Sequence, residues 1–178
     1  MLYLFLFFFS LMAAYFGCRR FQRSASLFST RIDAPKNVRD AAKRLRFVAQ
    51  PNVHSIVSVS VNSPQLCVTA MASAFAQMDD TTPPSDAVLL TSIQKHLALD
   101  ATTACDMVTM GAWLVQECGG PSPAFERLTK RLKQLDHGPY FGKMMNVIGD
   151  VKATGTKGMP SPRQADAMGM LARIFRTA

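Results

Sequence analysis

The dipeptide Pro-Ser returns at three places between residues 84 and 161 of this chain, with nearly constant spacing. The three copies are Pro84-Ser85, Pro121-Ser122 and Pro160-Ser161. A period in the high thirties is typical of helical repeats, in which each repeat is one pair of helices. A single pair cannot bury its own apolar face, so repeats of this kind stack to form a core. The spacing therefore predicts an all-α fold with three stacked antiparallel helix pairs, a short α-solenoid.

Each Pro-Ser copy is also a helix-start signal. A serine hydroxyl accepts hydrogen bonds from the free N–H groups of a first turn, and proline suits the first helical position, where Pro123 and Pro162 are expected. Gln164 follows Ser161 by three residues, which is the spacing of a capping box.

The apolar spacing after and before each copy is helical. Phe125, Leu128, Leu132 and Leu135 follow the second copy at intervals of three and four residues. Segments 64–78 and 104–118 precede the first two copies and match locally at an offset of 38, as in Cys67 with Cys105; the segment from Tyr140 is a looser third copy. The residues expected to dominate the core are Trp113, Leu114, Phe125, Leu128 and Leu132. The small residues at which helix backbones are expected to approach closely are Ala72, Ala74, Gly111 and Ala112.

The front of the chain carries a targeting or anchoring signal. Residues 2–17 are uncharged and largely apolar, at the short limit for a membrane-spanning helix, and basic residues follow, which would place the body in the cytoplasm. From Met12, residues 12–31 instead have the Arg-rich, Ser-rich and acid-poor composition of a mitochondrial presequence. We expect mitochondrial matrix targeting, with a membrane anchor as the alternative; either Met1 or Met12 is the start.

Residues 34–63 are expected to link this segment, residues 1–33, to the repeat domain at 64–178. Within them, residues 35–49 predict an N-terminal capping helix with an apolar stripe of Val38, Ala42, Leu45 and Val48. Its opposite face is basic. Residues 53–61 alternate like a strand, but an irregular or helical linker fits an otherwise helical chain equally well.

The sequence offers no pattern typical of an active site, cofactor or metal. It lacks the phosphate-loop, nucleophile-elbow and zinc-protease motifs, and we expect no enzymatic activity. The histidines are scattered, Asp79-Asp80 fits a solvated turn, and the four cysteines are expected to be reduced core thiols. A formal charge of +8 favours a phosphate-bearing or acidic partner.

The helix pairs resemble degenerate pentatricopeptide-type or octotricopeptide-type repeats, the α-solenoid families abundant in mitochondria. The third copy, YFGKMMNVIGDVKATGTKGMPSPRQADAMGMLARIF, carries this resemblance by pattern, without the family's RNA-reading positions. The chain is also similar to the small helical-repeat subunit on the F1 part of kinetoplastid ATP synthase. These resemblances imply a subunit or adaptor that contacts other proteins of a large mitochondrial assembly, of the ATP synthase or mitochondrial ribosome type.

A TerB-like helical domain behind a membrane anchor is an alternative resemblance. Its metal-associated acidic loops would have to be QMDDTTPPSD and DVKATGTKGMPSP. The second loop contains only Asp150, whereas calcium is bound by six or more oxygens.

Binding remains the expected function, with protein as the first partner class and RNA as the second. The candidate binding residues are Arg127, Lys130, Arg131 and Lys133, which fall between the core positions of one helix. A Met-rich face at Met107, Met110, Met144 and Met145 is either core or a protein-binding surface. A membrane is a partner only if residues 2–17 are retained.

Overall fold

The computed structural model describes residues 34–48, 61–79, 86–136, 138–154 and 159–176, all of which belong to one unit. Helices are the only regular elements in these ranges. They are α2 (Lys36–Arg44), α4 (Pro64–Gln77), α5 (Asp86–Leu97), α6 (Ala101–Glu117), α7 (Pro121–Leu135), α8 (Pro139–Thr154) and α9 (Pro162–Arg176). The predicted all-α fold class is confirmed. The segment predicted as strand or linker lies outside the described residues, except for Val61, which is buried in an irregular stretch.

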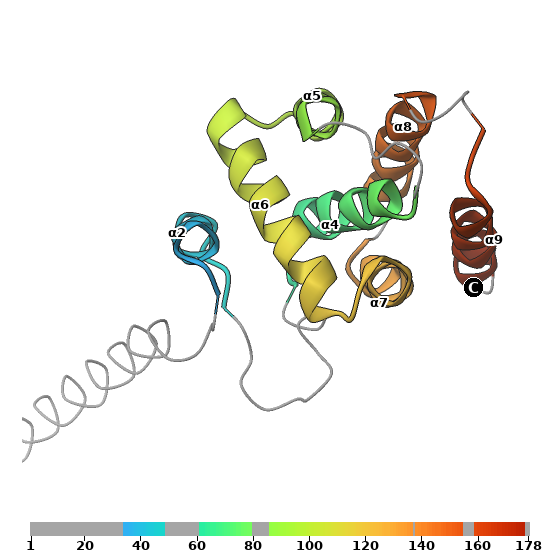
Figure 1. Cartoon of the computed structure of the whole chain (residues 1–178), viewed down its shortest axis with the longest axis horizontal. Coiled ribbons are helices and arrows are strands. Elements are labelled where there is room, and N and C mark those ends of the chain that lie inside the picture. The colour runs from blue at the N-terminus through green and yellow to red at the C-terminus, as the bar shows by residue number, and fades with distance from the viewer. Residues whose placement is uncertain (1–33, 49–60, 80–85, 137, 155–158, 177–178) are drawn as a thin grey trace, which may run out of the picture. The chain divides into compact units, whose positions relative to one another are not determined.

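The core is organised around α4. This helix has no charged residue, and every side chain from Leu66 to Ala76 is buried. A helix that is apolar all round is stable only when other helices surround it. The most extensive contacts of α4 are with α7 and α6, followed by α8, while α5 touches it less (Figure 1). In a linear stack of helix pairs, most contacts between helices would lie between successive pairs. Here, helices from all three predicted pairs contact α4 or are α4 itself.

α4 and α6 approach each other closely at Gly111. A Cβ atom at this position would lie 3.1 Å from Ser73 Oγ and 3.2 Å from Ala70 Cα. The prediction that Gly111 lies where two helix backbones meet is therefore confirmed. Glycine is required here because the partner atoms include backbone, which cannot move aside as a flexible side chain can.

The third Pro-Ser copy joins the ends of two helices. Ser161 and Gln164 form the predicted capping box: Gln164 N–H donates to Ser161 Oγ at 3.2 Å, and Ser161 N–H donates to Gln164 Oε1 at 3.0 Å. The same side chains also donate to the last carbonyls of α4, Ser161 Oγ to Met78 O and Gln164 Nε2 to Phe75 O. The two side chains of this capping box therefore cap the first turn of α9 and also donate hydrogen bonds to two carbonyl groups at the C-terminal end of α4.

The second Pro-Ser copy does not cap its helix as predicted. α7 begins at Pro121, two residues before Pro123, and its N-cap is Gly120 at φ 107°, with no side-chain cap. Ser122 is therefore an exposed residue inside the first turn. Ser85 of the first copy lies outside the described residues.

The first helix of the described residues, α2, packs on α6 (Figure 1). It buries Val38, Ala41 and Ala42, but it ends at Arg44, so the apolar stripe predicted to reach Val48 is interrupted. Val48 is 45% exposed, and Phe47 is the buried residue instead. The reason is the turn at Arg46, whose positive φ of 53° redirects the chain.

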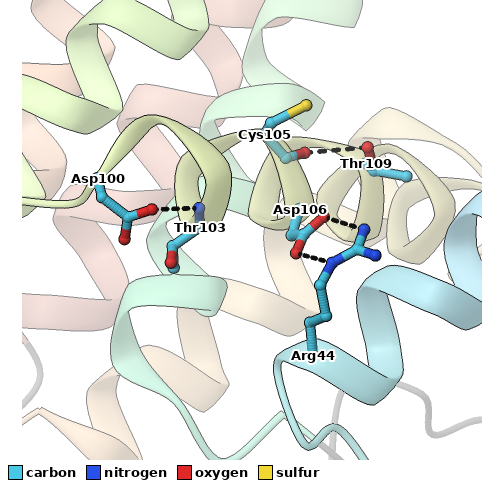
Figure 2. A network of polar contacts seen from close by, with 6 residues as sticks. All are labelled: Arg44, Asp100, Thr103, Cys105, Asp106 and Thr109. Carbon is cyan, nitrogen blue, oxygen red and sulfur yellow. Dashed lines mark hydrogen bonds and ion pairs between the residues drawn. The ribbon is translucent and has the colours of Figure 1, made fainter.

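An ion pair between helices holds the C-terminal end of α2. The Arg44 guanidinium donates two hydrogen bonds of 2.6 Å to the Asp106 carboxylate of α6 (Figure 2). The Asp106 side chain is only 7% exposed, so this bidentate partner compensates for its burial. Next to it, Phe47 packs edge-on against Trp113 with ring centroids 6.3 Å apart.

The predicted core is largely confirmed. Leu114, Phe125, Leu128 and Leu132 are fully buried. Trp113 is not, because it lies at the edge of the α2–α6 contact and keeps part of its ring exposed. Of the Met-rich face, Met107, Met110 and Met144 are buried and Met145 is half-buried, so this face belongs mainly to the core.

Candidate binding groove between α7 and α9

The four candidate cations of α7 divide into two pairs. Arg131 donates to Val61 O at 2.8 Å and to Asn62 Oδ1 at 2.7 Å, which fastens the segment before α4 onto α7. Lys133 donates to Ile174 O at 2.7 Å, near the C-terminus of α9. These two side chains hold other parts of the chain in place. Arg127 and Lys130 are exposed and face a different feature.

That feature is a groove of about 560 Å³ between α7 and α9, close to the end of α4. Arg127 and Lys130 line it from α7, and Arg163 lines it from the first turn of α9. Its apolar lining includes Met78, Ala167 and Met170. The groove therefore combines cationic side chains with apolar surface, as protein-binding sites for charged segments do.

Two acids moderate the charge of the groove. Glu126 accepts a 2.7 Å hydrogen bond from Lys130 one turn away, and this bond holds the pKa of Glu126 below its usual range. Asp166 also lines the groove and lies on α9, one helical turn after Arg163. Three cations and two acids leave the groove with a positive balance at neutral pH.

The sequence pointed to Arg127 and Lys130 but missed Arg163. The periodicity of α7 alone identifies its exposed cations. Arg163 joins them only because α9 packs against α7 in three dimensions, and no pattern within either helix encodes this contact.

Asp79, Asp150 and His96 do not line this groove. Asp79 is buried, so the predicted solvated turn is wrong at this position; Asp80, His54 and His137 lie outside the described residues. His96 of α5 pairs with Asp150 of α8 at 2.8 Å, and Ser92 Oγ donates to the same carboxylate oxygen at 2.9 Å. These bonds hold the pKa of Asp150 below its usual range.

A second cleft of about 480 Å³ adjoins this cluster, between α5 and α8. Its geometry does not assemble a nucleophile. In a hydrolytic triad the histidine bridges serine and carboxylate, whereas here Asp150 bridges Ser92 and His96. The cluster ties α5 to α8.

The cysteines do not all follow the core prediction. Cys67 and Cys118 are buried free thiols, and burial raises the pKa of both. Cys105 is exposed on α6, and Cys18 lies outside the described residues.

The described part of the chain contains no group of three or more His, Cys, Asp or Glu side chains placed to hold a metal ion. Among the described helices, none combines the length and apolarity needed to cross a membrane. In comparisons with known proteins, no family model, curated protein or solved structure matches this chain.

Proposed function

We propose that this chain is a non-enzymatic helical subunit or adaptor of a larger mitochondrial assembly, and that it binds an acidic segment of a partner protein in the α7–α9 groove. The proposal rests on one observation. Arg127, Lys130 and Arg163 gather around an apolar lining, on two helices that the core fixes relative to each other.

The chemistry of these cations suits carboxylates. An arginine guanidinium presents five N–H donors and binds a carboxylate through two of them. Arg127 directs one donor to Cys118 O at 3.4 Å, and its side chain is exposed. The Lys130–Glu126 pair is exposed and one turn apart, and such pairs contribute only about 0.3–0.5 kcal/mol, so a partner carboxylate can replace or join Glu126.

Location and assembly type are supported by sequence composition and helix order. Residues 12–31 have presequence composition. The order of the six helices α4 to α9 is compatible with three helix pairs, and α2 packs on α6 as an N-terminal cap would. The packing departs from a three-pair stack, because α8 packs mainly on α5 and α4 while α9 packs mainly on α7. The assembly that we propose is of the F1 ATP synthase or mitochondrial ribosome type.

The variant Arg127→Gln with Lys130→Gln tests the proposal. Its matched control is Lys95→Gln with Lys152→Gln, which removes the same charge from exposed positions on α5 and α8. Binding of a fluorescein-labelled oligoglutamate peptide is followed by anisotropy. We expect the groove variant to weaken binding about tenfold or more, since interface charges contribute at least 1.4 kcal/mol as a pair. The control should bind like wild type, and equal losses in both variants would refute a specific groove.

RNA is the alternative partner, and the same proteins distinguish it. If RNA occupies the groove, wild type binds an oligouridine probe more tightly than oligoglutamate. The groove variant then lowers the slope of log affinity against log salt by about one per lost phosphate contact.

A TerB-like domain is a second candidate, because the flanks of the two acidic segments meet. Ser161 Oγ donates to Met78 O at 3.1 Å, which brings the chain after α4 next to the chain before α9. The described residues provide no group of three or more potential metal ligands, and residues 80–85 and 155–158 of these segments lie outside the described ranges. Calorimetric titration with Ca²⁺ tests this candidate: binding at micromolar concentration would favour it over the adaptor.

A further inference from the structure

One face of α2 is strongly basic and points away from the core. Lys36, Arg39 and Lys43 are exposed, and with 100° between successive residues they fall within an arc of about 60°. Arg46, in the turn that follows, is exposed as well. We call these four side chains the basic face of α2. Asp40, half-buried on the same helix, is the one acid of α2.

The opposite face of α2 is already occupied. Val38, Ala41 and Ala42 are buried, and α2 packs on α6, where Asp106 holds Arg44. An interfacial membrane helix needs an apolar face that it can bury among lipids. α2 has no such face available while it packs on α6, so any surface that it meets must be bound by charge alone.

The sequence before α2 indicates which anionic surface this is. Residues 2–17 are uncharged and largely apolar, and Arg19, Arg20, Arg23 and Arg31 lie between them and α2. In a chain that keeps residues 2–31, the alternative to a removed presequence, positive charge therefore continues along the chain from an apolar segment to the basic face. Lys and Arg clusters that directly follow an apolar membrane segment are typical of sites that bind anionic lipid headgroups.

We infer that the basic face of α2 is a docking surface for an anionic membrane. It holds the helical unit against the headgroups without inserting into them. This surface is separate from the α7–α9 groove, so a protein partner and a membrane can be bound together.

Vesicle co-sedimentation of the full chain tests this inference. The apolar residues 2–17 can bind vesicles of any charge, so the measured quantity is the ratio of affinities for phosphatidylserine-containing and pure phosphatidylcholine vesicles. The test variant changes Lys36, Arg39, Lys43 and Arg46 to Gln. The control changes Lys95, Lys152, Arg173 and Arg176 to Gln, which removes the same charge from exposed positions on other helices. Thermal melts check that both variants fold. We expect the α2 variant to fold because the side chains that it changes are exposed.

The expected result is a clear anionic preference in wild type and control, lowered by about two to three orders of magnitude in the α2 variant. Each Lys or Arg beside an anionic surface contributes roughly a factor of five. The preference should also fall as salt is raised. An equal loss in both four-residue variants would overturn the inference, because net charge alone would then explain it. An α2 variant that keeps its lipid preference but loses binding to oligouridine would assign the face to RNA instead.

Discussion

The crossing of α4 and α6 at Gly111 leads to a specific stability prediction. Replacing glycine by alanine inside a helix normally stabilises by about 1 kcal/mol. At Gly111 the added methyl would meet Ser73 Oγ at 3.1 Å and the Ala70 backbone at 3.2 Å. Overpacking in a core costs about 1–3 kcal/mol. We therefore expect Gly111→Ala to lower the free energy of unfolding by about 1 kcal/mol, opposite in sign to the helix propensity.

A control and a partner substitution separate the causes. Gly149 is exposed in α8, and a Cβ there meets nothing within 4 Å, so Gly149→Ala should stabilise by up to about 1 kcal/mol. Ser73 Oγ is buried and has no hydrogen-bond partner among the described residues. Ser73→Ala should therefore stabilise by about 1 kcal/mol, and it removes one of the two close contacts of the new methyl.

The assay is urea denaturation followed by circular dichroism for wild type, the three single variants and the Ser73→Ala, Gly111→Ala double variant. Because the two positions are in contact, the cost of Gly111→Ala should shrink by about 0.5–1 kcal/mol in the Ser73→Ala background. If Gly111→Ala stabilises as much as Gly149→Ala does, the two helices do not cross at this position and the α4-centred core is refuted.

Three further predictions follow from other contacts. Leu132→Ala should lower the free energy of unfolding by about 2–5 kcal/mol because Leu132 is fully buried. Trp113→Ala should lower it by less because Trp113 is partly exposed. Equal losses of stability in urea denaturation would contradict these burial assignments. Gln164→Ala should cost about 1–3 kcal/mol, since it removes the hydrogen bond from Ser161 N–H to Gln164 Oε1 and the bond from Gln164 Nε2 to Phe75 O of α4. An unchanged melting temperature would contradict this double role. The pKa of Asp150 is lowered in the folded state by its hydrogen bond with His96, so the stability contributed by this carboxylate is present above the ordinary carboxyl pKa and is lost as pH falls below it. The difference in unfolding free energy between wild type and Asp150→Asn should therefore shrink below about pH 4. A difference that grows there would contradict this role of Asp150.

Much of the secondary structure could be predicted from local patterns. Apolar residues at intervals of three and four located the helices, and Ser161 with Gln164 marked the start of α9 correctly. Both signals depend on residues within a few positions of each other. The start of α7 was misplaced because Gly120 and Pro121 begin the helix without any side-chain cap.

The packing of the helices could not be predicted in the same way. The central place of α4 had a visible signal, since Pro64–Gln77 contains no charged residue, but the repeat pattern favoured equal roles for all pairs. The role of Arg131 depends on Val61, which lies 70 residues before it. The role of Lys133 depends on Ile174, which lies 41 residues after it. The groove itself forms only where α9 meets α7.

Site-specific photo-crosslinking in native cells measures the occupancy of the α7–α9 groove most directly. A benzophenone amino acid replaces Ser122, an exposed residue of the groove, or Thr91, an exposed residue of the α5–α8 cleft, in the full-length chain. The account predicts that the probe at Ser122 crosslinks to a discrete protein through a segment rich in Asp and Glu, and that the probe at Thr91 does not. Crosslinks from Ser122 to RNA, or the same set of products from both positions, would contradict it.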